Sequence, residues 1–327
     1  MAILVTGGAG YIGSVAVADL CAAGEAVVVL DNLVYGHRAA VDDRAVLYEG
    51  SIGDSSLVTR ILEEHSIEAV MHFSAYAYVG ESVEHPGKYY RNNVVETAAL
   101  LEAMTAKRVR KLVFSSTCAT YGEPQFTPID ESHPQNPTHP YGWTKLFVEK
   151  MLEGYAVAHD LRSVSLRYFN AAGATEKLGE QHEPETHLIP LVLDAADGKR
   201  KSVSIYGTDY PTRDGTAVRD YIHVSDLSDA HLLSLEYLRS GGGSEVFNLG
   251  NGNGYTVREV IDAAKQVTGR EFSVIETGRR AGDPSELVAD SSKAVEVLGW
   301  KPVNPEIEDI IGSVWSWRRR HPNGFKK

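Results

Sequence analysis

Tyr141 and Lys145 are the first residues whose types and spacing suggest chemistry. They lie four positions apart, and no other tyrosine of this chain has a lysine at that distance. In a helix the two side chains would share one face. A neighbouring ammonium group favours the ionised form of a phenol, so such a pair can take up and return a proton. The same spacing also occurs on ordinary exposed helices, so its meaning depends on what surrounds it.

Thr117 is the third candidate for this chemistry. It follows the apolar run 111–114 and two serines, Ser115 and Ser116. The run predicts a buried strand, and a loop then leads to a predicted helix over 141–158. A hydroxyl group at the carboxyl end of that strand can complete a proton-handling site with Tyr141.

A glycine-rich turn near the N-terminus suggests a second function. Residues 2–6 predict a buried strand, and Gly7, Gly10 and Gly13 follow it before an apolar-periodic helix that runs to about residue 23. Such glycines permit a tight turn, a close approach of the backbone to a pyrophosphate, and close packing of the helix. The N-terminus of that helix would present free N–H groups to phosphates.

Asp31 supports the same interpretation. It ends a second predicted strand, 27–30, and follows Gly13 by 18 residues. A carboxylate there accepts hydrogen bonds from a ribose diol and repels a 2′-phosphate. The unit therefore predicts binding of NAD rather than NADP, and Arg38, a nearby cation, is the one feature that argues the other way.

Further strands and helices alternate along the chain, and they must position these residues. The predicted strands are 45–49, 68–73, 111–115 and 162–168, and the predicted helices are 54–65, 88–106 and 141–158. This order indicates an α/β fold, a Rossmann-type doubly wound parallel sheet. Ligands bind beyond the carboxyl ends of such strands, where Gly7, Asp31, Phe73 and Ser115 to Thr117 all fall.

The C-terminal part is less regular. Residues 170–186 resemble a loop, and the predicted elements after it are strands at 203–206, 218–224 and 246–249 and helices at 225–239, at 256–268 and from about 305. We expect a NAD-binding domain over 1–168, with returns of the chain near 218–250, and a smaller α/β substrate lobe over 169–327. Cationic and aromatic residues there fit either a nucleotide diphosphate or solvated charges and core aromatics: Tyr206, Arg219, Tyr221, Arg279 and Arg280.

Composition excludes several functions. The net charge of −12 argues against a nucleic-acid partner, and no apolar stretch is long enough to cross a membrane. The chain has no signal peptide pattern, and its two cysteines lack framework spacing, so we expect a cytoplasmic protein without disulfides. There is no His/Cys cluster with metal-ligand spacing, and we expect no metal.

Longer stretches resemble the UDP-glucose (UDP-galactose) 4-epimerases, a family of extended short-chain dehydrogenases/reductases. The similar stretches cover nearly the whole chain in order: 6–13, 31–33, 72–73, 79–83, 89–94, Tyr141 to Lys145, 167–170, 206–212, 214–216, 218–224, 248–250 and 279–283. The resemblance implies an NAD-dependent isomerase of galactose metabolism that inverts C4 of a UDP-sugar through a 4-keto intermediate. It also implies a homodimer formed by the helices near 88–106 and 141–158, with Phe147 and Met151 as interface candidates.

The resemblance assigns roles to individual residues. Tyr141 would be the catalytic base, Thr117 its hydroxyl partner, and Lys145 would bind the nicotinamide ribose. The cofactor site would comprise Gly7, Gly10, Tyr11, Ile12, Gly13, Asp31, Asn32, Ser51, Ile52, Phe73, Ser74, Ala75, Asn92, Ser115, Tyr141, Lys145 and Tyr168. The substrate site would comprise Thr117, Tyr141, Asn170, His187, Leu188, Tyr206, Arg219, Arg280 and Asp283, with Tyr206 stacking on uracil and Tyr168 lining the sugar pocket.

Four positions depart from the family pattern. Thr117 replaces a frequent serine and keeps the hydroxyl group. Ser51 stands where an acidic residue usually contacts adenine, and Ala77 stands where a lysine is often found. Leu287 replaces a tyrosine that closes the sugar pocket in some members.

Other functions remain open. Residues 76–78 and 117–124 look closer to enzymes acting on UDP-pentoses, so a UDP-glucuronate or UDP-xylose/UDP-arabinose 4-epimerase is the main alternative. A sugar-nucleotide dehydratase commonly has an Asp-Glu pair after the active-site threonine, whereas Cys118 and Ala119 follow here. A non-catalytic NAD-binding protein is the remaining alternative.

Overall fold

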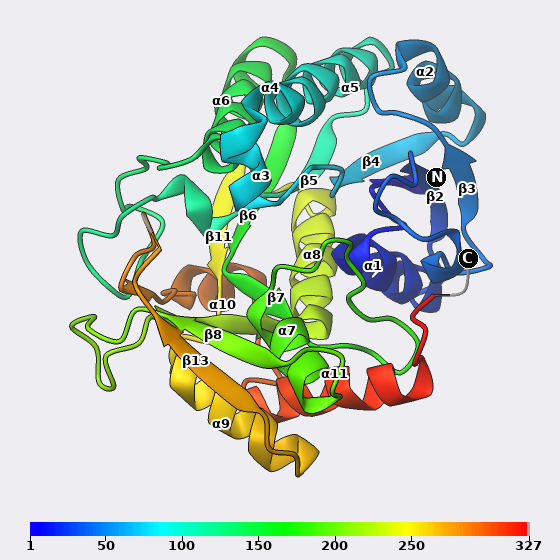
Figure 1. Ribbon diagram of the computed structural model, residues 1–327. Coiled ribbons are helices and arrows are strands. Elements are labelled where there is room, and N and C mark those ends of the chain that lie inside the picture. The colour runs from blue at the N-terminus through cyan, green and yellow to red at the C-terminus, as the bar shows by residue number, and fades with distance from the viewer. Residues whose placement is uncertain (281, 326–327) are drawn as a thin grey trace.

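The computed structural model describes residues 1–280 and 282–325 (Figure 1). Within these residues, seven parallel strands form the central sheet, in the order β11-β6-β5-β4-β1-β2-β3. The strands are β1 (Ala2–Thr6), β2 (Ala26–Asp31), β3 (Val46–Glu49), β4 (Ile67–His72), β5 (Lys111–Ser115), β6 (Arg162–Tyr168) and β11 (Glu245–Leu249). The predicted Rossmann-type doubly wound sheet is therefore confirmed.

Helices cover both faces of this sheet, because its strands are apolar on both sides. In β1, Ile3 and Val5 belong to one buried core, and Ala2 and Leu4 belong to the other. The first core is shared with α1 (Tyr11–Ala22), α8 (Val224–Arg239) and α10 (Ser292–Leu298). The second is shared with α2 (Ser55–Glu64), α5 (Glu96–Ala106) and α6 (Pro140–His159). This alternation follows from the period of two along a strand.

A smaller lobe lies beyond the carboxyl ends of the strands (Figure 1). Its core joins α7 (Leu188–Ala196), α9 (Val257–Thr268), α11 (Ile307–Arg320) and β8 (Ser202–Tyr206). Short strand pairs complete it: β7 (Asn170–Ala172) with β10 (Tyr221–His223), β8 with β13 (Ser273–Thr277), and β9 (Val218–Arg219) with β12 (Tyr255–Thr256) and β14 (Glu286–Leu287).

Several elements differ from the sequence predictions. The expected helix 88–106 consists of α4 (Pro86–Tyr89), a π-helical stretch (Tyr90–Val95) and α5. The extra residue per turn lets the buried Asn93 turn inward, where its side chain holds the backbone of Tyr76 through two bonds of 2.9 Å. Residues 170–172 form a strand rather than a loop. Further elements were not predicted from the sequence: α3 (Val79–Glu84), α7, and short 3₁₀ turns at Arg38–Ala40 and Cys118–Thr120.

The structure also bears on membrane-spanning helices and on disulfide bonds. Across residues 1–280 and 282–325, no helix combines the length and apolar character that crossing a membrane requires. Cys21 and Cys118 are both free thiols.

Candidate active site

The glycine turn joins β1 to α1 at the point where the chain order of the sheet reverses. Gly7 has a φ of +74°, and a Cβ there would lie 2.6 Å from the backbone nitrogen of Ser74. A Cβ on Gly13 would lie 2.3 Å from the carbonyl oxygen of Gly7. Larger residues are therefore excluded at both positions, as the sequence predicted.

The N-terminus of α1 is suited to an anion. Gly10 precedes the helix without a side-chain cap, and the first turn, Tyr11 onward, contains no acidic residue. The first N–H groups of a helix have no partner within it and carry the positive end of its dipole. This turn accordingly fits the pyrophosphate of a dinucleotide.

Asp31 lies buried at the end of β2. Its carboxylate accepts hydrogen bonds from the backbone N–H groups of Ala9, at 3.0 Å, and Leu33, at 2.8 Å. Burial raises the pKa of Asp31, and these two bonds oppose the rise. Asp31 thus ties the glycine turn to the second strand and keeps acceptor capacity for a ribose diol. The guanidinium of Arg38 is paired with Glu49 at 2.7 Å, and Asn32 is exposed.

Glu96 is a residue of this region that the sequence analysis missed. Its carboxylate accepts a 2.5 Å hydrogen bond from Ser51, the position where an acidic residue was expected. Ile52 beside it is buried. Glu96 is the first residue of α5, directly after the π-helical stretch. A distant part of the chain therefore supplies a carboxylate next to Ser51, where the family pattern has an acidic residue.

The segment after β4 supplies further cofactor candidates. Phe73 is partly buried and its ring lies 4.6 Å from that of His231, while Ser74 approaches Gly7 closely. Ala75 is half-buried. Asn92 donates to the amide oxygen of Asn93 at 2.8 Å. Asn93, which bonds the backbone of Tyr76, therefore holds this loop in place. Nothing in the sequence favours Asn93 over Asn92 for this role.

Ala77 is exposed where the family pattern suggested a lysine. Nearby, the ammonium group of Lys88 lies 4.2 Å from the ring centre of Tyr76 and pairs with Glu81 at 2.7 Å. A cation therefore reaches the neighbourhood of Ala77 from α4.

Helix α6 positions the predicted catalytic pair. The helix begins at Pro140, and the His139 ring accepts a hydrogen bond from the Gly142 N–H at 3.2 Å while stacking parallel to Tyr141. His139 was not predicted, although a capping side chain before a proline at N1 is a recognisable helix start. One turn on, Lys145 is 3% exposed and donates to the backbone oxygen of Ser115 at 2.6 Å. This bond joins the helix to the end of β5, where Thr117 follows.

The environment changes the protonation of the pair. Burial lowers the pKa of Lys145 to about 7, an effect that the Glu149 carboxylate opposes. Burial and the neighbouring Tyr168 raise the pKa of the Tyr141 phenol, and a hydrogen bond involving Thr117 opposes this rise. Without a positive partner Tyr141 is thus a neutral phenol at neutral pH. A cationic ligand beside it would favour the phenolate.

Tyr168 and Ser115 border the same pocket. Their hydroxyl groups are hydrogen-bonded to each other, and both residues are buried at the ends of neighbouring strands. Thr117 is also buried, and its hydroxyl accepts from the N–H of Ala119 at 3.1 Å. The structure therefore brings Tyr141, Lys145, Thr117, Ser115 and Tyr168 together, as the sequence predicted.

The predicted substrate residues line the lobe side. The Arg280 guanidinium lies 3.8 Å above the ring centre of Tyr206, which is 37% exposed. Arg219 forms an ion pair with Asp283. The Asn170 side chain donates to the backbone oxygen of Asp220 at 2.8 Å. A partly exposed aromatic ring with an arginine beside it, and a second arginine in the same lobe, suit a planar base carrying phosphates.

Asp220 holds this side of the site in place, and the sequence analysis did not identify that role. It is wholly buried, and its carboxylate accepts from the N–H groups of Asn251 at 2.8 Å, Gly252 at 3.0 Å and Ala289 at 3.1 Å. Leu188 begins α7, and His187 before it is exposed, with its ring nitrogen 2.5 Å from Glu180. Leu287 lies half-buried in β14 beside β9.

Comparisons with known proteins agree with this geometry. The pattern of the NAD dependent epimerase/dehydratase family matches residues 3–250. A UDP-glucose 4-epimerase of Lacticaseibacillus casei is 51% identical over 327 residues, which cover 99% of each chain. A crystal structure of a UDP-glucose 4-epimerase, 50% identical, superimposes with a TM-score of 0.98 over 100% of both chains. The Bifidobacterium longum UDP-glucose 4-epimerase in complex with NAD+ and UDP is 39% identical, with a TM-score of 0.94 over 99% of this chain and 100% of that one.

Proposed function

We propose that this chain, which belongs to the NAD dependent epimerase/dehydratase family, is an isomerase that inverts C4 of a UDP-sugar and interconverts UDP-glucose and UDP-galactose through a 4-keto intermediate. One observation carries the proposal at the level of the site. The bond from Lys145 to Ser115 brings Tyr141 and Thr117 to the sheet edge where the glycine turn opens. Half-identical relatives of nearly equal length support the same reaction.

The cofactor site fits NAD. The cradle around Gly7 and Gly13 and the uncapped start of α1 would hold the pyrophosphate, and Asp31 would bind the adenosine ribose. Glu96 and Ser51 would face the adenine. Bound NAD would supply a hydride acceptor that can also act as a hydride donor. Lys145 would bind the nicotinamide ribose. Its ammonium group, which donates to the backbone oxygen of Ser115, would then either break that hydrogen bond or keep it and donate a second one to the ribose.

Tyr141 carries out the proton transfer. Its hydroxyl oxygen, as phenolate, takes the proton of the sugar C4 hydroxyl, either directly or through Thr117, and gives it back after the sugar has turned. The phenolate requires positive charge nearby, since burial alone raises the pKa of Tyr141. Lys145 stands one helical turn away and supplies part of that charge when it is protonated.

The substrate is anchored through its nucleotide. Tyr206 would stack on the uracil, Arg219, Arg280 and Asp283 would hold the UDP portion, and Asn170, His187 and Leu188 would border it. Strong binding of the nucleotide leaves the sugar free to present either face at C4. Tyr168 would line the sugar pocket.

Dehydration is disfavoured by the residues after Thr117. The position that would need an acid holds Cys118, whose pKa burial raises to about 12, and Ala119 follows it. A thiol with so high a pKa is a poor general acid at neutral pH, and Ala119 has no ionisable group that could act as the base of the pair.

The assembly and the division of the chain are part of the proposal. We infer a NAD-binding domain over 1–168 with returns near 218–250, and a substrate lobe over 169–327, since β11 and α8 join the sheet. We infer a homodimer through the face around α6. Exposed apolar side chains there support it, namely Val79, Val83, Tyr90, Val95 and Phe147, with Met151 half-buried on the same helix. Free Cys21 and Cys118 agree with a cytoplasmic location.

Incubation with single UDP-sugars tests the function. Purified protein with NAD should convert UDP-galactose to UDP-glucose and the reverse, followed by chromatography or proton NMR of the sugar. UDP-N-acetylglucosamine, UDP-glucuronate and UDP-xylose, tested in parallel, define the accepted C5 and C2 groups. If the protein epimerises UDP-xylose or UDP-glucuronate but not UDP-glucose, the proposed substrate is wrong. If it forms a 4-keto-6-deoxy sugar, the reaction is a dehydration and the proposed epimerisation is wrong.

A further inference from the structure

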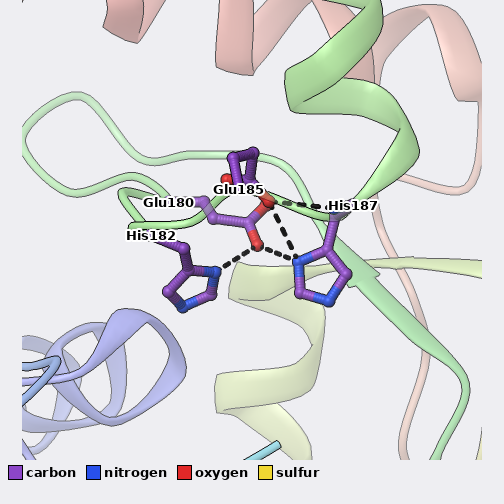
Figure 2. A group of neighbouring side chains, drawn as sticks. All are labelled: Glu180, His182, Glu185 and His187. Carbon is purple, nitrogen blue, oxygen red and sulfur yellow. Dashed lines mark hydrogen bonds and ion pairs between the residues drawn. The ribbon is translucent and has the colours of Figure 1, made fainter. Parts of the chain in front are cut away.

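Four side chains with metal-ligating atoms gather in the loop between β7 and α7. They are Glu180, His182, Glu185 and His187, and each offers one ligand atom within 4.8 Å of the others. Figure 2 shows the carboxylate of Glu180 lying between the two imidazole rings. Two of the four residues are glutamates, so the group lacks the His/Cys spacing of a familiar metal motif and was not predicted from the sequence.

The ligand atoms of the group lie close enough together to surround one ion. Oε1 of Glu180 lies 3.0 Å from Nδ1 of His182 and 2.5 Å from Nδ1 of His187, and Nδ1 of His187 lies 3.6 Å from Oε1 of Glu185. Ligand atoms about 2.1 Å from a tetrahedral zinc ion stand roughly 3.4 Å apart. Small side-chain rotations therefore suffice to place one ion among these atoms.

Two polar groups at this position lack partners. Nδ1 of His182 is buried and, although close to Glu180, forms no aligned hydrogen bond within the described part of the chain. The Tyr78 hydroxyl is likewise buried without a hydrogen-bond partner among these residues, and Tyr78 is 8% exposed. Its ring packs edge-on against His182, with 5.8 Å between centroids. Unsatisfied buried polar atoms call for an explanation, and a bound ion is one of the recognised ones.

We propose that Glu180, His182, Glu185 and His187 bind one divalent transition-metal ion of the zinc class. Two imidazoles and two carboxylates favour zinc over magnesium or calcium, which prefer all-oxygen shells. The two carboxylates balance the ion's charge when both imidazoles are neutral. In the ion-pair network Nδ1 of His182 faces Glu180 without an aligned hydrogen bond, whereas a metal ion would give this nitrogen a directed partner.

The place of this loop suggests what the ion does. Its first part is held by Tyr11, whose hydroxyl donates to the backbone oxygen of Gly173 at 2.6 Å, and the Tyr11 ring lies edge-on to His182. Its last part leads into Leu188 at the start of α7. An ion among the four ligands therefore fixes the segment that runs from the glycine-turn helix to the substrate lobe. The role is structural, and of the four ligands only His187 also belongs to the proposed substrate site.

Metal content tests the proposal directly. Untagged wild-type protein is treated with chelator, supplied with Zn²⁺, freed of excess ion and analysed by mass spectrometry, while a chromogenic indicator competes for the ion. We expect one zinc per chain, and at least a tenfold weaker affinity in Glu180→Gln and in His182→Gln. The exposed His159→Gln is the matched control and should bind as the wild type does. No bound zinc, or equal affinity in the wild type and a Glu180→Gln/His182→Gln double variant, would overturn the site.

A measurement on the wild type alone covers the case in which the variants fail to fold. Zn²⁺ added to chelator-treated protein should raise the Tm by roughly 5 °C, a chelator should reverse the rise, and Mg²⁺ should not cause it. A Tm unaffected by Zn²⁺, or raised equally by Mg²⁺, contradicts the proposal. Cobalt provides a spectroscopic check, because a tetrahedral Co²⁺ site has far stronger visible absorption than an octahedral one.

Discussion

Glu149 and Arg167 form a buried ion pair joined by two hydrogen bonds, with Nε and an NH₂ group of Arg167 at 3.0 and 2.6 Å from the two carboxylate oxygens. Their side chains are 4% and 6% exposed. The same carboxylate accepts from Ser116 at 2.5 Å and lies one turn along α6 from Lys145. This pair ties α6, β6 and the loop that carries Thr117 to one another.

Breaking that pair should destabilise the protein strongly. Arg167→Met leaves the buried Glu149 carboxylate without its main partner, so we expect a loss of about 3–5 kcal/mol in the free energy of unfolding. Chemical denaturation measures it. Replacing the exposed Arg110, which pairs with Asp160 at the surface, by methionine is the control and should cost less than about 1 kcal/mol. If both variants lose the same free energy of unfolding, the buried pair stabilises the protein no more than the surface pair does.

Tyr141→Phe should lower turnover by about 10²–10⁴-fold while UDP binding is kept. The substitution removes only the hydroxyl that transfers the proton. Initial rates with UDP-galactose and calorimetric titration with UDP measure the two effects. Tyr155→Phe, further along the same helix, serves as the control, and near-normal turnover in Tyr141→Phe would contradict the mechanism.

Asp31→Asn should weaken NAD binding by roughly tenfold or more. The amide keeps one acceptor but loses the charge-assisted bonds that a carboxylate makes to N–H groups and to a ribose diol. Titration of cofactor-depleted protein with NAD gives the affinity. The nearby, exposed Asp43→Asn is the matched control. If both variants bind NAD as the wild type does, the assignment of Asp31 is wrong.

Glu96→Gln tests the carboxylate that the fold brings to Ser51. If Glu96 faces the adenine, the variant should bind NAD several-fold more weakly, because the neutral amide is a weaker acceptor for an amino group. Glu102→Gln, on the exposed side of the same helix, is the control. Unchanged NAD affinity in Glu96→Gln would remove this residue from the adenine site.

His72 should make the protein acid-sensitive. Burial lowers its pKa to about 3, with a contribution from Lys145, and its ring is hydrogen-bonded to Thr6 at 2.7 Å and Thr97 at 3.0 Å. Between pH 6.5 and 3, His72 is therefore protonated in the unfolded state and neutral in the folded state. The free energy of unfolding consequently falls as the pH falls. In His72→Gln the slope of unfolding free energy against pH should decrease by up to about 1.4 kcal/mol per pH unit in this window. The exposed His159→Gln should leave the slope unchanged, and an unchanged slope in His72→Gln would refute the depressed pKa.

The sequence by itself determined the sheet and the cofactor turn, and it predicted which residues form the catalytic group. These features depend on local patterns: glycines at positions that exclude a Cβ, apolar strands buried on both faces, and a tyrosine and lysine one turn apart. The glycines and the apolar strands are specified within a few neighbouring residues, whereas the Tyr141/Lys145 pair gained its meaning from the cofactor turn and from Thr117. The NAD-binding unit could therefore be predicted as a whole.

Tertiary structure alone decided which side chains from distant segments meet. Glu96 reaches Ser51 because a π-helical turn redirects its helix, Arg167 finds Glu149 across two elements, and Asp220 gathers three backbone N–H groups from two loops. The metal-ligand group at 180–187 is local in sequence, yet only the loop conformation turns its four side chains toward one point. Such contacts depend on packing and on buried hydrogen bonds, which have no periodic trace in the sequence.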